Sequence, residues 1–133
     1  MIAHISFAVS DYARSKAFYR AALAPLGYTL VMELTPQVTG SVYVAGFGDG
    51  SAKHADFFIA SAPPGSKAND PMHVAFWAKS PAHVDAFHAA AIISGGNDNG
   101  APGPRAEYGP DDYVAFALDP DGHRLEVWYM KPV

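Results

Sequence analysis

Residues 72–96 read MHVAFWAKSPAHVDAFHAAAIISGG, and they repeat the pattern of residues 3–27, which read AHISFAVSDYARSKAFYRAALAPLG. In both stretches a short apolar run precedes a run with helical spacing, and a glycine follows. An offset of 69 residues aligns, in pairs, His4 with His73, Phe7 with Phe76, Phe18 with Phe87 and Gly27 with Gly96. Because these matches keep one register through the whole stretch, they indicate an internal repeat.

The repeat continues beyond the helical run, where the same offset aligns Phe47 with Phe116 and His54 with His123. Each copy reads as a strand, a helix and three further strands. We therefore expect an α+β fold of two tandem βαβββ repeats that form mixed sheets facing each other around a cleft. The expected parts of this single domain, residues 1–133, are repeat one at about 1–62, a polar linker at about 63–71 and repeat two at about 72–133.

Composition excludes several classes of protein. The 133 residues are 50% hydrophobic and 17% charged, which is typical of one globular domain. The absence of cysteine excludes disulfides and thiolate chemistry. A net charge of −4 without a basic run argues against nucleic-acid binding. No apolar run is long enough to span a membrane and no leader-like segment opens the chain, so we expect a cytoplasmic location.

Three residues suggest a metal site. Strand alternation places His4 and His73 on the cleft faces of their strands, away from the more apolar helix-facing sets. In the last strand, Glu126 interrupts an otherwise apolar run, and a buried carboxylate is costly unless it is paired or bound to a cation. Two histidines and one glutamate suit a divalent metal such as Zn, Ni, Mn or Fe, and three protein ligands leave open coordination positions. An ordinary ion pair of Glu126 with Arg105 or Arg124 is the alternative.

Other side chains of the expected strands and loops could serve ligand binding or simple packing. The candidates for a substrate pocket are Phe58, Trp77, Tyr108, Tyr113 and Trp128. The same residues are equally consistent with packing in the hydrophobic core. The other four histidines lie by turns or on the second helix, and we expect solvated positions for His54, His83, His88 and His123. The catalytic base is not assigned, with Glu107, Tyr108 and a metal-bound water as weak candidates.

The repeat, the two histidines and the closing run YGPDDYVAFALDPDGHRLEVWY, residues 108–129, resemble the vicinal-oxygen-chelate superfamily. That superfamily includes glyoxalase, bleomycin-resistance proteins and extradiol dioxygenases. By this resemblance His4, His73 and Glu126 fall on three of four metal-ligand positions. The fourth position would be taken by Asp56, Phe57 or Phe58; the offset of 69 residues favours Phe57, and only Asp56 could act as a ligand.

The resemblance implies a metal-dependent lyase or isomerase of the glyoxalase kind that binds a small substrate through two adjacent oxygens. The alternative is a metal-free protein that sequesters a small molecule, as bleomycin-resistance proteins do. A third reading is a degenerate member without metal or chemistry. The resemblance also implies a homodimer, in which the cleft forms either within one chain or by exchange of halves between chains.

Overall fold

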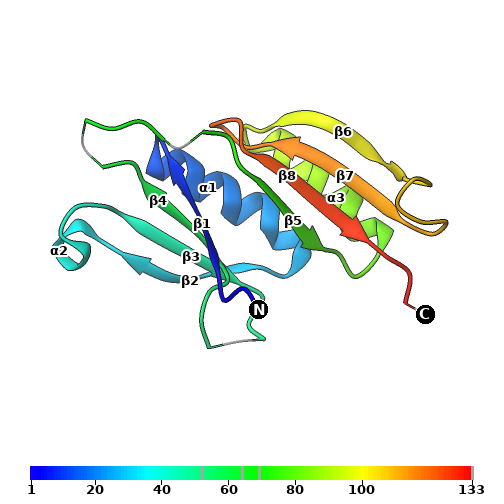
Figure 1. The fold of residues 1–133 in the computed structure, drawn as a ribbon, viewed down its shortest axis with the longest axis horizontal. Helices are drawn as coiled ribbons and strands as arrows, with labels where there is room; N and C mark the ends of the chain where they lie inside the picture. Colours follow the sequence, from blue (N-terminus) through cyan, green and yellow to red (C-terminus); the bar gives the residue numbers. More distant parts are fainter. Residues whose placement is uncertain (52, 64, 69, 133) are drawn as a thin grey trace.

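The computed structural model describes residues 1–51, 53–63, 65–68 and 70–132, which form two four-stranded sheets and the helices that cover them (Figure 1). The first sheet has the order β1-β4-β3-β2, with β1 at Ile5–Val9, β2 at Thr29–Leu34, β3 at Val44–Gly48 and β4 at Phe57–Ser61. The second sheet has the order β5-β8-β7-β6, with β5 at His73–Trp77, β6 at Asn97–Pro104, β7 at Tyr113–Leu118 and β8 at Arg124–Tyr129.

Each sheet is mixed. β1 pairs with β4, and β5 with β8, in parallel, whereas the other strand pairs are antiparallel. Helix α1 at Tyr12–Leu23 follows β1 and helix α3 at Pro81–Ile93 follows β5, with a 3-10 turn at Ala24–Leu26 and the one-turn helix α2 at Pro36–Thr39 in the first copy. The predicted α+β fold of two βαβββ repeats is confirmed. Of the predicted linker, residues 64 and 69 lie outside the described residues.

Both main helices begin after a residue whose side chain caps the first turn. Asp11 accepts a hydrogen bond from the backbone N–H of Arg14 at 3.0 Å, and Ser80 accepts one from His83 at 3.4 Å. The two aligned glycines that follow the helices serve different needs. Gly27 has φ +86°, which side-chain-bearing residues rarely adopt, whereas a Cβ on Gly96 would lie 2.7 Å from the carbonyl oxygen of Leu118.

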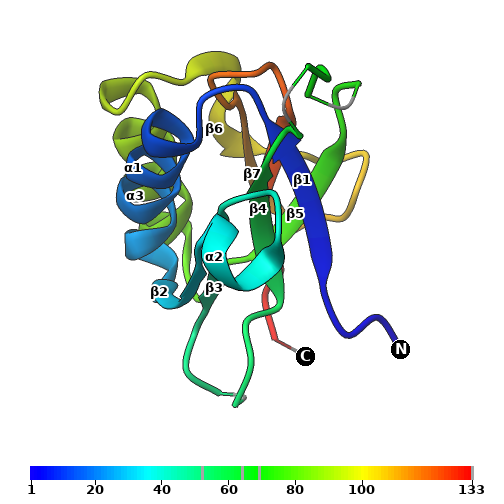
Figure 2. The same cartoon turned by 90° about the vertical axis from the view of Figure 1, so that its left-hand side faces the viewer.

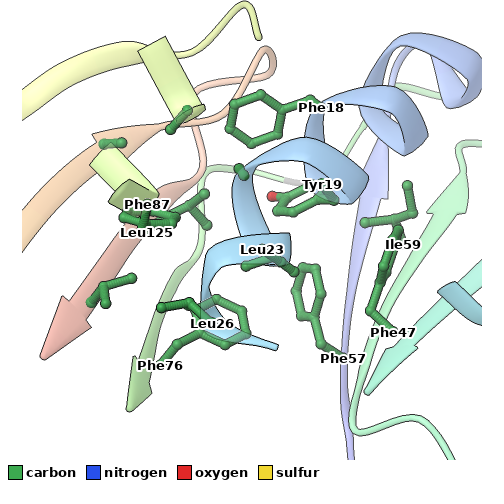
Figure 3. Close-up of a cluster of buried hydrophobic side chains, with 14 of the residues drawn as sticks. Phe18, Tyr19, Leu23, Leu26, Phe47, Phe57, Ile59, Phe76, Phe87 and Leu125 are labelled. Atoms are coloured by element: carbon green, nitrogen blue, oxygen red, sulfur yellow. The ribbon is translucent and has the colours of Figure 1, made fainter. Parts of the chain in front are cut away.

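The two copies share one hydrophobic core. Helices α1 and α3 pack against each other on the same side of both sheets (Figure 2). Phe57 from the first sheet and Phe76 from the second meet edge to face, with 5.4 Å between ring centroids. Fully buried Phe18 and Leu23 of α1 and Phe87 of α3 belong to the same cluster (Figure 3). Because the cluster spans both repeats, burial of apolar surface stabilises them as one unit.

His123 is the clearest departure from the sequence expectations. It was expected to be solvated, but it is fully buried at the junction of the repeats. Its Nδ1 accepts a hydrogen bond from the backbone N–H of Met72 at 3.0 Å, its Nε2 donates to the carbonyl oxygen of Ala8 at 3.1 Å, and its ring stacks on Phe7 at 4.4 Å. One acceptor and one donor nitrogen define a neutral imidazole. His123 therefore connects β1 of the first repeat with the start of the second.

The side of the sheets opposite the helices carries exposed side chains. On β5 the residues His73, Ala75 and Trp77 are exposed, and His4, just before β1, is exposed as well. Among the described residues, no helix is both long and apolar enough to cross a membrane. Below, the side of each sheet opposite the helices is called its open face.

Candidate functional site

His73 and Glu126 meet on the open face of the second sheet. Strands β5 and β8 run in parallel with Ala75 opposite Glu126, so the imidazole at the start of β5 reaches the carboxylate on the next strand. The Nε2 of His73 lies 2.9 Å from Oε2 of Glu126. The His73 side chain is 43% exposed and that of Glu126 is 9% exposed. The pair therefore has one side available to a ligand.

The other carboxylate oxygen of Glu126 is the atom that points to a cation. Glu126 Oε1 is buried and has no hydrogen-bond partner among the described residues. Such an orphaned acceptor is costly because it loses its water without compensation. Arg105, an alternative partner, donates instead to the carbonyl oxygens of Pro104 and Ala101. A buried, partly unsatisfied carboxylate beside an imidazole fits a divalent metal by the chemistry of its donors.

His4 occupies the matching place on the first sheet, but against a different neighbour. Its ring contacts Phe58 edge to face, with 5.1 Å between centroids. Phe58 lies opposite Ser6, just as Glu126 lies opposite Ala75, the residue that aligns with Ser6. Phe58 is therefore the structural equivalent of Glu126.

The other two candidates for this position lie elsewhere. Phe57, which the sequence offset favoured, is 1% exposed and packs in the core. Asp56 accepts a hydrogen bond from the hydroxyl of Tyr28 at 3.0 Å. Burial, reinforced by this hydrogen bond, raises the pKa of Tyr28 above its ordinary value.

One chain brings together two of the three predicted metal ligands. Among residues 1–51, 53–63, 65–68 and 70–132, no three His, Asp or Glu side chains gather closely enough to hold a metal ion. His73 and Glu126 are hydrogen-bonded on the second sheet, whereas His4 lies on the first. A three-ligand site therefore requires the open faces of the two sheets to come together. Within the described residues of one chain they do not.

Three aromatic side chains cluster beside Glu126. Trp77 and Trp128 are neighbours in the β5–β8 pairing, and their rings lie 5.3 Å apart. Tyr108, on the turn after β6, lies 5.1 Å from the ring of Trp128. Trp77 is 64% exposed and Tyr108 is 46% exposed. We call Trp77, Trp128 and Tyr108 the aromatic platform.

Two of the predicted pocket residues lie apart from the platform. Tyr113 pairs with Tyr129 in register and its hydroxyl donates to Asp85 of α3 at 2.9 Å, which places it on the helix side of the sheet. That hydrogen bond raises the pKa of Tyr113. Phe58 lies on the first sheet, against His4. The predicted set therefore divides among three places.

The sequence reasoning missed the direct contact of His73 with Glu126 and the burial of His123. The first had a usable signal, because a βαβββ unit places its first and last strands side by side. The second had none in the turn itself, since a DPDG turn usually lies at the surface. His88 and His83 are also partly buried rather than free, with His88 2.8 Å from Asp98 and His83 2.6 Å from the hydroxyl of Ser80.

Comparison with known proteins identifies the family and the fold. The family model for the Glyoxalase/Bleomycin resistance protein/Dioxygenase superfamily matches residues 1–127. The chain belongs to this superfamily. A search of curated protein sequences found no significant match to the chain.

Solved structures show the same fold. A glyoxalase/bleomycin resistance protein from Albidiferax ferrireducens T118 has 30% identity and a TM-score of 0.72, over 97% of this chain and 98% of that one. Glyoxalase I from Zea mays has 23% identity and a TM-score of 0.70, over 96% of this chain but 45% of that one. A glyoxalase-related enzyme from Fulvimarina pelagi has 17% identity and a TM-score of 0.66, over 98% of this chain and 88% of that one. The last two likenesses concern the fold alone.

Proposed function

We propose that this protein is a divalent-metal-dependent lyase or isomerase that acts on a small substrate through two vicinal oxygens. The observation that carries the proposal is the orphaned Oε1 of Glu126, buried beside a half-exposed His73. The metal, when bound, supplies a Lewis acid that stabilises negative charge developing on adjacent substrate oxygens. Membership of the superfamily, whose members commonly use divalent metals, supports it further.

The chain itself would supply the metal-ligating atoms from His73 and Glu126. His73 offers Nε2, the nitrogen that now faces the carboxylate, and Glu126 offers both oxygens. Binding requires the neutral imidazole and the ionised carboxylate, so any proton shared between them leaves as the metal enters. The low exposure of Glu126 keeps bulk water from that side of the site.

His4 would come from a second copy of the chain. We infer a homodimer in which the open face of the first sheet of one copy covers the open face of the second sheet of the other. Support comes from the separation of His4 from His73 and Glu126 within one chain. The exposed apolar side chain of Met32, which lies on the open face of the first sheet, also favours burial against a partner.

Elemental mass spectrometry tests the metal directly. Untagged wild-type protein should carry one zinc, nickel, manganese or iron ion per chain, and His73→Ala, Glu126→Gln and His4→Ala should each lose most of it. His54→Ala, a change at an exposed histidine outside the pair, is the matched control and should keep the metal. A wild-type protein that remains metal-free after incubation with all four ions would refute the metalloenzyme.

A metal-free binding protein is the second candidate, and the aromatic platform favours it. Flat rings with high exposure can hold a ligand without any metal. The two functions separate in one measurement. Ligand binding that survives a chelator and His73→Ala supports sequestration, whereas turnover that is lost with either treatment supports the enzyme.

A further inference from the structure

The aromatic platform contains a donor without an acceptor. The indole Nε1 of Trp128 is buried and makes no hydrogen bond to any described residue. Buried tryptophan N–H groups usually find a partner, because burying one without compensation is unfavourable. The rings of Trp77 and Tyr108 both lie near this indole, and the two residues are 64% and 46% exposed. The platform therefore combines exposed apolar surface with a hydrogen-bond donor that has no acceptor among the described residues.

The orphaned carboxylate oxygen lies on the same face. Glu126 and Trp128 are two residues apart on β8, so their side chains point to the same side of the sheet, about 7 Å apart along the strand. That separation is about the length of one aromatic ring with its substituents. One molecule can therefore reach the metal-binding pair and the platform at once.

We propose that the platform selects substrates in which a planar aromatic or conjugated group is attached directly to the vicinal oxygens. The flat group stacks on Trp77, with Tyr108 beside it, and an acceptor atom on it receives the N–H of Trp128. This inference rests on the proposed function, because the metal at His73 and Glu126 fixes the oxygen end. An aliphatic substrate would leave both the rings and the indole N–H without partners.

Hydroxamates test this, because they present two vicinal oxygens to a metal and carry any chosen group beside them. Zinc-loaded protein is titrated with acetohydroxamate, benzohydroxamate and cyclohexanecarbohydroxamate, the last being a saturated ring of similar bulk. The chain has two tryptophans, Trp77 and Trp128, and both belong to the platform, so tryptophan fluorescence reports on it directly. Calorimetry gives the affinities.

We expect benzohydroxamate to bind about tenfold more tightly than the other two and to quench tryptophan fluorescence. In Trp77→Ala the advantage of benzohydroxamate over the other two compounds should fall to about twofold or less. Trp77→Phe should keep most of it. The hydrogen bond from the Trp128 N–H is tested with pyridine rings, whose nitrogen can accept it. Nicotinohydroxamate or isonicotinohydroxamate should bind severalfold more tightly than benzohydroxamate, and Trp128→Phe should remove this gain in affinity.

The contrary results are distinct. If none of the hydroxamates binds the zinc-loaded protein, the proposed function fails and this inference with it. If all three bind with equal affinity, or if the preference survives Trp77→Ala, the function stands and the inference is overturned. A Trp77→Ala protein that dissociates into monomers with its ligand preference intact identifies the platform as a contact between copies. If neither pyridine compound gains, the acceptor for Trp128 is refuted.

Discussion

Phe58 and Glu126 occupy the same position in the two repeats, each opposite the second residue after the histidine of its sheet. In the second sheet this position gives a hydrogen bond of 2.9 Å between His73 and the carboxylate. In the first sheet it gives an edge-to-face contact between His4 and an aromatic ring. The repeats are thus equal in fold and unequal in chemistry on their open faces.

Phe58→Glu should give the first sheet a histidine–glutamate pair equivalent to that of the second. A carboxylate beside His4 adds a ligand, so we expect zinc affinity to rise at least about tenfold, or about 1.4 kcal/mol. Without metal the half-buried charge should lower stability by about 1–3 kcal/mol. Zinc titration and chemical denaturation with and without chelator measure both effects. Phe58→Gln is the uncharged control, and equal zinc affinity in the two variants would contradict the expected role of this position.

Glu126→Gln should change the metal-free and metal-loaded proteins in opposite directions. The amide can keep a hydrogen bond to His73 while removing a buried charge, so the stability of the metal-free protein should stay equal or rise by about 1 kcal/mol. The stabilisation that added zinc gives the wild type should be largely lost. Thermal unfolding with chelator and with zinc checks this. Zinc stabilisation equal to that of the wild type would exclude Glu126 as a ligand.

His123→Ala should be strongly destabilising. It leaves the N–H of Met72 and the carbonyl oxygen of Ala8 without this partner and opens a cavity beside Phe7. We expect a loss of about 3–5 kcal/mol in the free energy of unfolding. Urea denaturation measures it, with His54→Ala at an exposed site expected to stay within about 0.5 kcal/mol of wild type. A loss of the size of the control's would show that the junction does not depend on His123.

Tyr19→Phe should lower the free energy of unfolding and make it less dependent on pH above pH 10. The Tyr19 hydroxyl donates to Asp119 at 2.7 Å in a buried site, so its removal should cost about 1–3 kcal/mol. Burial, and then the charge of Asp119, hold the pKa of Tyr19 well above its ordinary value of 10.0. Because the folded state favours the protonated phenol, this contribution is complete below pH 10 and is lost as the pH rises beyond it.

Urea denaturation of wild type and Tyr19→Phe at several pH values tests the sign. The difference in stability between the two should be constant below pH 10 and should narrow above it. A difference that stays constant above pH 10 would mean that the phenol ionises as readily in the folded protein as in the unfolded chain.

The sequence predicted the fold well because the repeat is carried by residues that face the shared core. Phe7 and Phe76 are both buried on the helix side of their sheets, and their spacing to the helices is equal. Strand alternation then separated the open face from the core face without further information. Alternation placed His73 on the open face, and its contact with Glu126, which the sequence reasoning missed, could have been inferred because the first and last strands of each unit are neighbours.

The offset failed where the loops differ in length. Ser6 and Phe58 are paired across β1 and β4 and are 52 residues apart, whereas Ala75 and Glu126 are paired across β5 and β8 and are 51 apart. A constant offset therefore shifted the fourth ligand position by one residue, from Phe58 to Phe57. Since side chains alternate, one residue exchanges the open face for the core. The place of His4 relative to the pair could not be predicted either, because alternation gives a face but not its partner.

The shared core has a consequence for how such a protein can change over time. The helix side of both repeats is a joint structure, in which Phe57 of one sheet meets Phe76 of the other. Substitutions there affect both halves together. The open faces carry no such obligation, and they differ at Ser6 and Ala75 and at Phe58 and Glu126. Duplication thus leaves one scaffold with two surfaces that lie outside the shared core, so that the ligand chemistry of an open face can change while the core stays as it was.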